Sequence, residues 1–271
     1  MCVARAGFFL GGLRARFCVP LSSPFFAQRL EPADRKTLLL SIVDRLRQPS
    51  ARARVVVFDL DGTLMDNRPR VVKILHELSE EWRASHPDAA ESVAQATPDR
   101  IVYGFIENLQ QLGVKDALLH EAGLAFWKAR FFFDHHVRHD IEVPGAREYV
   151  WACHEAGAVI VYLTGRDLPN MALGSFASLR DLGFPIGIVG TELVTKPTFE
   201  MADSDFKRAV APQLARLGEV VAVFDNEPLN CNLFLDAHPQ CTSVFLDTQH
   251  APNPPLLDRR AHVIDTFERG G

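Results

Sequence analysis

The sequence "RVVVFDLDGTLMDNRP" (residues 54–69) places an apolar run directly before two aspartates. The run 55–58 has no polar alternation, which predicts a strand covered on both faces in the middle of a parallel α/β sheet. Asp59 and Asp61 follow where this strand gives way to glycine, and ligands of open α/β sheets bind beyond the carboxyl ends of the strands. Two neighbouring carboxylates repel each other unless a cation or a reaction uses them. The alternative is that "DG" is only a solvated turn. Matching residues elsewhere in the chain would favour a functional site over this turn.

The composition narrows the class of protein. A chain of 271 residues that is 47% hydrophobic and 23% charged allows one large domain or one domain with an insertion. Its net charge of −5 gives no general basic surface for nucleic acid, and no apolar run approaches a membrane span. The five cysteines form no CxxC pair, so neither a disulfide framework nor a cysteine zinc site is indicated. We therefore expect a cytoplasmic protein with small-molecule partners, no nucleic acid and no membrane.

The N-terminal segment differs in composition from the rest of the chain. It contains four arginines and several phenylalanines, with no acid before Glu31. A targeting segment, a mobile extension and an overlong translation start are the three interpretations, and we favour a mobile extension over residues 1–36. From Lys36 to Gln48 apolar residues recur at helical spacing, which predicts a helix packed beside the first strand.

Beyond the opening motif, apolar strands alternate with helices. Four further stretches end in polar or glycine residues and predict short strands, namely 158–167, 185–190, 220–228 and 242–248. Helical signals lie between them, at 145–156, 169–182 and 204–217. This order predicts an α/β fold with a doubly wound, Rossmann-like parallel sheet, built from residues 37–66 and 143–271.

The segment 67–142 lacks a strong strand signal. Three amphipathic helical stretches fill it, at 71–86, 98–113 and 116–137. About seventy-five residues are too many for a simple crossover, whose connecting loops are usually only a few residues long. We therefore expect an inserted α-helical domain over this segment.

Residues at other strand ends could form a site together with Asp59 and Asp61. Asp225 ends the third of the four strand signals and gives a second acidic strand end, and two such ends suggest Mg²⁺, which prefers oxygen ligands. The hydroxyl of Thr164 and the backbone amides of a turn at Gly165 could hold an anion. Two lysines, Lys196 and Lys207, lie before the acidic strand and could neutralise a transferred group.

In this order, the residues resemble the four motifs of the haloacid dehalogenase-like superfamily. The first motif is the segment 59–63, the second comprises Thr164, Gly165 and Arg166, the third is a lysine and the fourth begins at Asp225. The first motif is highly specific, whereas the other three are informative through their order and spacing. The resemblance covers 37–66 and 143–250 and makes the inserted segment similar to the helical cap of that superfamily.

The resemblance implies a mechanism. Asp59 would be the nucleophile that attacks phosphorus and forms an aspartyl-phosphate intermediate. Asp61 would protonate the leaving oxygen and then deprotonate the hydrolytic water. Mg²⁺ would be held by Asp59, the backbone carbonyl of Asp61 and Asp225, while Thr164 and a lysine would hold the phosphoryl oxygens.

Two points stay open within this resemblance. Lys207 opens a helical stretch just before the Asp225 strand and is the favoured phosphoryl lysine, with Lys196 expected to bind substrate beside Gly165. Asn226 and Glu227 stand where the family commonly has a second aspartate, so either could assist the metal.

The function expected from these residues is a Mg²⁺-dependent phosphatase acting on a small phosphate monoester. A phosphomutase or phosphotransferase would use the same residues and differ in whether water or another hydroxyl attacks the intermediate. A catalytically silent binding protein of the same fold is the third class. Intact Asp59 and Asp61 favour an enzyme.

Overall fold

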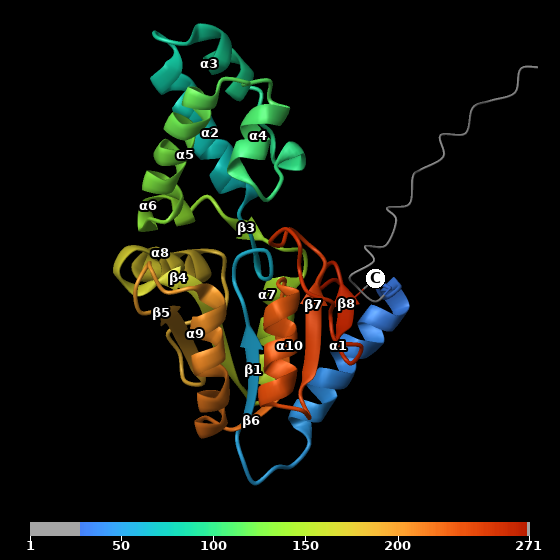
Figure 1. Ribbon diagram of the computed structural model, residues 1–271. Coiled ribbons are helices and arrows are strands. Elements are labelled where there is room, and N and C mark those ends of the chain that lie inside the picture. The colour runs from blue at the N-terminus through green and yellow to red at the C-terminus, as the bar shows by residue number, and fades with distance from the viewer. Residues whose placement is uncertain (1–27, 270–271) are drawn as a thin grey trace, which may run out of the picture.

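The computed structural model describes residues 28–269, which form a sheet-based core and a group of helices above it (Figure 1). The sheet has six parallel strands in the order β5-β4-β1-β6-β7-β8. The strands are β1 Arg54–Phe58, β4 Ala158–Asp167, β5 Thr191–Lys196, β6 Glu219–Asp225, β7 Thr242–Leu246 and β8 His262–Ile264. Helices cover both faces of this sheet, which confirms the predicted α/β fold with a doubly wound parallel sheet.

The two helical layers contribute to separate hydrophobic clusters. One face of the sheet packs against α1 Pro32–Arg47, α7 Ala146–Glu155 and α8 Leu168–Asp181. The other face packs against α9 Asp203–Val210, the short 3-10 helix η2 Ala211–Arg216 and α10 Pro228–Ala237. Val56 and Phe58 of β1 enter the first cluster, whereas Val55 and Val57 enter the second. Successive side chains of a strand point to opposite faces, so burial on both faces explains the unbroken apolar run of β1.

The predicted strand at 185–190 is wrong. Gly187 and Gly190 have φ angles of 71° and 83°, a left-handed conformation that interrupts an extended strand. The strand instead begins at Thr191, as β5, and pairs in parallel with β4. The apolar run therefore forms the turn before the strand.

Three element boundaries also differ from the prediction. The helix predicted at 204–217 is divided, because α9 gives way to η2 just before Pro212. Strand β8, of three residues, was not predicted from the sequence. Helix α1 begins at Pro32 rather than near residue 37, and Leu30 before it donates a backbone hydrogen bond to Val263 of β8. Of the predicted extension, residues 1–27 lie outside the described part of the chain.

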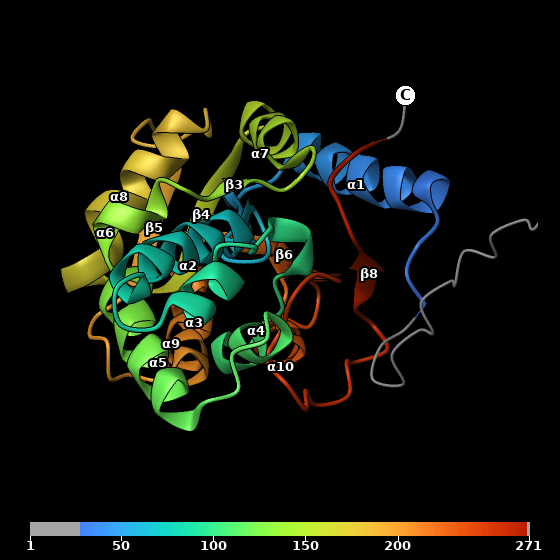
Figure 2. The same ribbon diagram turned by 90° about the horizontal axis from the view of Figure 1, so that it is seen from above.

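A group of helices, here called the helical insertion, occupies residues 68–137. It comprises α2 Arg68–Trp82, α3 Pro87–Val93, the 3-10 helix η1 Pro98–Arg100, α4 Phe105–Gln111, α5 Ala117–Phe131 and α6 Asp134–Val137. The chain enters through β2 Met65–Asp66 and leaves through β3 Ile141–Glu142, and these two strands pair antiparallel. The insertion has its own hydrophobic cluster, whose buried members all lie between residues 71 and 114. Figure 2 shows its helices above the sheet. None of the helices within residues 28–269 is long and apolar enough to cross a membrane.

Candidate active site

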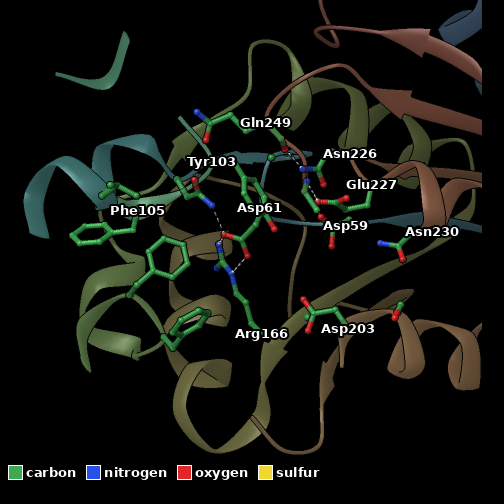
Figure 3. A pocket seen from close by; sticks show the side chains of 18 of the residues that line it. Asp59, Asp61, Tyr103, Phe105, Arg166, Asp203, Asn226, Glu227, Asn230 and Gln249 are labelled. Carbon is green, nitrogen blue, oxygen red and sulfur yellow. Dashed lines mark hydrogen bonds and ion pairs between the residues drawn. The ribbon is translucent and has the colours of Figure 1, made fainter. Parts of the chain in front are cut away.

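A cavity of about 520 Å³ lies between the carboxyl ends of the strands and the helical insertion. The acidic and basic side chains come from the core side, together with the apolar Met171 and Leu229, and the insertion contributes mainly aromatic and aliphatic side chains, together with the amide of Asn108. In Figure 3, Asn226, Glu227 and Asn230 lie on one side of Asp61, whereas Phe105 lies on the other side. The cavity therefore has one mainly polar wall and one mainly apolar wall.

Lys207 lies between two of the predicted site residues. Its Nζ donates to Asp59 Oδ1 and to Asp225 Oδ2, in both cases at 2.7 Å. The three side chains come from α9, the end of β1 and the end of β6, which meet because β1 and β6 are neighbours in the sheet. Lys196 is not part of this group, since its Nζ donates to Asp203 Oδ1 at 2.8 Å. The structure thus brings Lys207, and not Lys196, to the two acids.

This group carries an excess of negative charge. Burial alone would lower the pKa of Lys207, but Asp225 and Asp59 raise it above its usual value, so the ammonium stays charged. Burial raises the pKa of Asp59, against the lowering effect of Lys207, and the nearby Asp225 adds to the increase. One ammonium therefore faces two buried carboxylates, and a further cation would stabilise the ionised form of both.

Asp225 is fixed at both oxygens. Its Oδ1 accepts hydrogen bonds from the backbone N–H of Glu227, at 2.9 Å, and from Asn230 Nδ2, at 3.0 Å. Its Oδ2 accepts the bond from Lys207. The first turn of α10 thus holds this carboxylate in one orientation, which suits a residue that has to present a ligand or a charge at a defined place.

The residues after Asp225 are also engaged. Asn226 Nδ2 donates to the backbone carbonyl of Gln249 at 2.5 Å, and a Cβ added at Gly62 would lie 2.3 Å from that same nitrogen. Gly62 has a φ of 74°, so both its conformation and its contact favour glycine. Glu227 lines the cavity, and burial, to which the charge of Asp225 adds, raises its pKa to about 7.

The donor set fits a hard cation. Among residues 28–269, no three His, Cys, Asp or Glu side chains cluster closely enough to hold a metal ion by themselves. Asp59 and Asp225 form a carboxylate pair, and Asp59 Oδ2 has no hydrogen-bond partner in this part of the chain. Mg²⁺ is usually bound through one or two carboxylates, water and substrate phosphate, so a pair of acids is the number it needs.

Asp61 belongs to a different set of ion pairs. Its Oδ2 accepts from Arg166 Nε at 2.7 Å, and its Oδ1 accepts from Arg70 Nη2 at 2.6 Å. Both arginines also bind Asp140, with Arg70 Nε at 2.8 Å from Oδ1 and Arg166 Nη2 at 2.6 Å from Oδ2. The four side chains form a closed network with no net charge, which we call the arginine network.

The arginine network controls the charge of Asp61. Burial alone would raise its pKa, but Arg166 and Arg70 lower it well below the usual range. Asp61 is therefore a carboxylate in this arrangement. Sequence reasoning missed Arg70 and Asp140, because they lie at the two ends of the insertion and no local motif marks them.

Thr164 and Gly165 do not form the predicted turn. Strand β4 continues to Asp167, with an irregularity in its pairing with β5 between Thr164 and Asp167. Thr164 is buried, its Oγ1 accepts from the backbone N–H of Arg166 at 3.2 Å, and it is not among the residues that line the cavity. Gly165 does line it, and a Cβ there would lie 2.2 Å from Asp203 Oδ2. Glycine at this position therefore lets α9 approach β4.

The sequence comparisons agree with these positions. A family model described as a haloacid dehalogenase-like hydrolase matches residues 53–228, which is more than half of the chain and includes both groups of charged residues described above. No curated protein matches the chain.

Solved structures resemble this one at low sequence identity. A Clostridium difficile protein provisionally named a phosphatase has a TM-score of 0.51 and 11% identity, covering 80% of this chain and 96% of that chain. A Haemophilus somnus 129pt protein provisionally named a phosphoglycolate phosphatase has a TM-score of 0.48 and 15% identity, covering 79% and 95%. A Bacteroides fragilis protein provisionally named a haloacid dehalogenase-like hydrolase has a TM-score of 0.46 and 14% identity, covering 79% and 97%. The first of these similarities shows a shared fold.

Proposed function

Because the chain belongs to the haloacid dehalogenase-like hydrolases, we propose that it is a Mg²⁺-dependent phosphatase acting on a small phosphate monoester through an aspartyl-phosphate intermediate. The observation that carries this proposal is the group formed by Asp59, Lys207 and Asp225 at the edge of the cavity. A nucleophilic carboxylate, a fixed cation and a second carboxylate are the parts that phosphoryl transfer requires.

In the first half of the proposed reaction, Asp59 attacks phosphorus. A bond forms between an Asp59 oxygen and phosphorus, and the bond from phosphorus to the alcohol oxygen breaks. Lys207, already at 2.7 Å from Asp59, lies where it can also compensate charge on the phosphoryl oxygens. Mg²⁺, held by Asp59, the backbone carbonyl of Asp61 and Asp225, would supply further positive charge there.

In the second half, water attacks the phosphorus of the intermediate and frees Asp59. The proton of this water passes to Asp61, whose ion pairs with Arg166 and Arg70 keep it in the carboxylate form that a base needs. Protonation of the leaving alcohol in the first half needs the opposite form of Asp61. For that step its contact with at least one arginine has to be lost.

The proposal is tested by measuring phosphate release from a panel of phosphate monoesters. We expect turnover with Mg²⁺, none with EDTA, and recovery when Mg²⁺ is added back in excess. Asp59→Asn should abolish turnover, because an amide is not a nucleophile for phosphorus, while its circular dichroism spectrum stays that of the wild type. Full activity in EDTA would refute the metal, and turnover by Asp59→Asn would refute the covalent route.

A further inference from the structure

We infer that the cavity selects monophosphate esters of uncharged alcohols that carry an aromatic or broad apolar group. This inference rests on the proposed phosphatase function and concerns the part of the substrate that leaves as the alcohol. It follows from three properties of the cavity: the aromatic side chains of one wall, the positions of its cations, and its size.

Besides Tyr103, four aromatic side chains of the helical insertion line the cavity, and we call these four the aromatic wall. They are Phe105, Trp127, Phe131 and Phe132. Trp127 stands at the centre, with ring centroids 5.3 Å from Phe105 and 4.7 Å from Phe131 in stacked arrangements and 5.2 Å from Phe132 in an edge contact. Stacked and edge contacts of this kind hold each ring in place, so the wall offers a preformed apolar surface.

The cations of the cavity are all at its polar wall. Among the described residues that line the cavity, Lys207 and Arg166 are the only basic ones. Lys207 is already bound to two aspartates and Arg166 to Asp61 and Asp140. The other charged lining residues are acids, so a second anionic group on the substrate would meet no unpaired cation here. Burying such a group without a partner is costly, and the cavity therefore disfavours it.

A buried donor in the aromatic wall lacks a partner. The indole Nε1 of Trp127 is inaccessible to solvent and makes no hydrogen bond within residues 28–269. Because this N–H is closed off, a bound alcohol meets the aromatic rings of the wall and not the indole donor. The wall thus suits an apolar, uncharged group.

The size of the cavity agrees with this class. About 520 Å³ is within the range of roughly 300–1,000 Å³ found for small-molecule pockets. A phosphoryl group at Asp59 leaves room beside it for a ring that contacts the aromatic wall. The core thus recognises the phosphoryl group, and the insertion recognises the alcohol.

Three alkyl monoesters test the inference without changing the type of leaving oxygen. They are 2-phenylethyl phosphate, ethyl phosphate and phosphoglycolate, the last carrying a second anion. We expect kcat/KM of the wild-type chain with Mg²⁺ to be at least tenfold higher for 2-phenylethyl than for ethyl phosphate, and lowest for phosphoglycolate. Equal or faster hydrolysis of phosphoglycolate would overturn the inference and leave the phosphatase proposal standing.

Two tryptophan variants, one in the aromatic wall and one outside it, test the role of the wall. Trp127→Ala should bring the ratio of the 2-phenylethyl to the ethyl rate close to one. Trp151→Ala removes an indole that does not line the cavity, and it should keep the wild-type ratio. An unchanged ratio in Trp127→Ala would refute the role of the wall.

A binding measurement keeps the two proposals separable. Calorimetry on the wild-type chain with Mg²⁺ should show that 3-phenylpropylphosphonate, which cannot be hydrolysed, binds at least tenfold more tightly than propylphosphonate. If none of the three esters is hydrolysed, the phosphatase proposal fails, and the phosphonates then decide the inference alone. Equal binding of the two phosphonates would overturn it. The same titration replaces the kinetic test if Trp127→Ala does not fold.

Discussion

The polar wall and the aromatic wall of the cavity are built on different principles. On the core side, each charged residue is oriented by partners from other elements, as Asp225 is by Lys207, Glu227 and Asn230. On the insertion side, the side chains are oriented by packing, as Trp127 is by its aromatic neighbours. Ion pairs and hydrogen bonds fix individual atoms, whereas packing fixes a surface. The difference suggests that the core determines the reaction and that the insertion determines which alcohol is accepted.

If the polar wall performs the reaction, the largest effect after the loss of the Asp59 nucleophile should come from Asp61→Asn. The variant retains a hydrogen-bonding group but cannot take the proton of the attacking water, so steady-state turnover should fall roughly 10²–10⁴-fold. With 4-nitrophenyl phosphate, whose leaving group needs no protonation, rapid mixing should still show a burst of 4-nitrophenol, because only the second half of the reaction is blocked.

A neighbouring acid provides the control for this variant. Asp66 pairs with Arg68 and does not line the cavity, so Asp66→Asn should turn over at a rate close to the wild type. If Asp61→Asn gave neither a burst nor turnover while remaining folded, Asp61 would act before the intermediate forms. Normal steady-state turnover by Asp61→Asn would remove it from the mechanism.

The next effect concerns the two lysines. Lys207→Ala removes the cation at 2.7 Å from Asp59, and the loss of such a preorganised charge costs on the order of 3–4 kcal/mol of transition-state stabilisation. Lys196→Ala removes a cation that pairs with Asp203 at the rim and should mainly raise KM. Steady-state kinetics of both variants test this, with thermal melting to verify folding. If Lys196→Ala were the inactive variant, Lys196 and not Lys207 would be the lysine that acts on the phosphoryl group.

A smaller effect is expected where the insertion orders a loop over the cavity. Asn108 is buried and bonds both backbone groups of Val102, at 2.8 Å each, and the carbonyl of Gly104 at 2.9 Å. Asn108→Ala should lower the free energy of unfolding by about 1–3 kcal/mol, because it leaves these groups unpaired. Since Asn108 and Val102 both line the cavity, KM should rise while kcat stays near the wild type. A loss confined to kcat would contradict the division between the walls.

The smallest effect should come from Tyr103→Phe. Tyr103 lines the cavity from the insertion, is 55% exposed, and makes no hydrogen bond through its hydroxyl within the described chain. Unfolding free energy should change by less than about 0.5 kcal/mol, as for other surface substitutions, and kcat/KM should change little. A tenfold loss of kcat/KM in steady-state kinetics would show that this hydroxyl binds substrate, so the insertion would supply more than an apolar surface.

The sequence predicted the polar wall better than the aromatic wall, for a physical reason. Asp59 follows β1 and Asp225 ends β6, two strands buried on both faces, and parallel strands bring their carboxyl ends to one edge of the sheet. An acid at the end of each strand can therefore be predicted to lie in a shared site. The aromatic wall has no such rule, because Phe105 and Trp127 lie on helices whose packing depends on the whole insertion.

The wrong strand prediction and the missed site residues also have physical causes. The run 185–190 is apolar, but its glycines adopt left-handed φ angles. Glycine can adopt such angles but can equally adopt the extended ones of a strand, so the sequence does not decide between them. Arg70 and Asp140 bond to each other across 70 positions of sequence, and nothing in either neighbourhood marks the partner. Long-range ion pairs of this kind follow from the position of the insertion on the core, which the sequence pattern alone does not specify.

The short pair of strands β2 and β3 has a consequence for how this protein can change. Met65 pairs with Glu142 and Asp66 with Ile141, so the two ends of the insertion are held side by side. The helical insertion is therefore a loop whose two ends are closed by this strand pair. The entropic cost of closing a loop grows only slowly with its length. A shorter or longer segment could therefore be exchanged at this junction with little effect on the sheet. A replacement that keeps Arg70, which binds Asp61, would exchange the aromatic wall and leave the reaction centre intact.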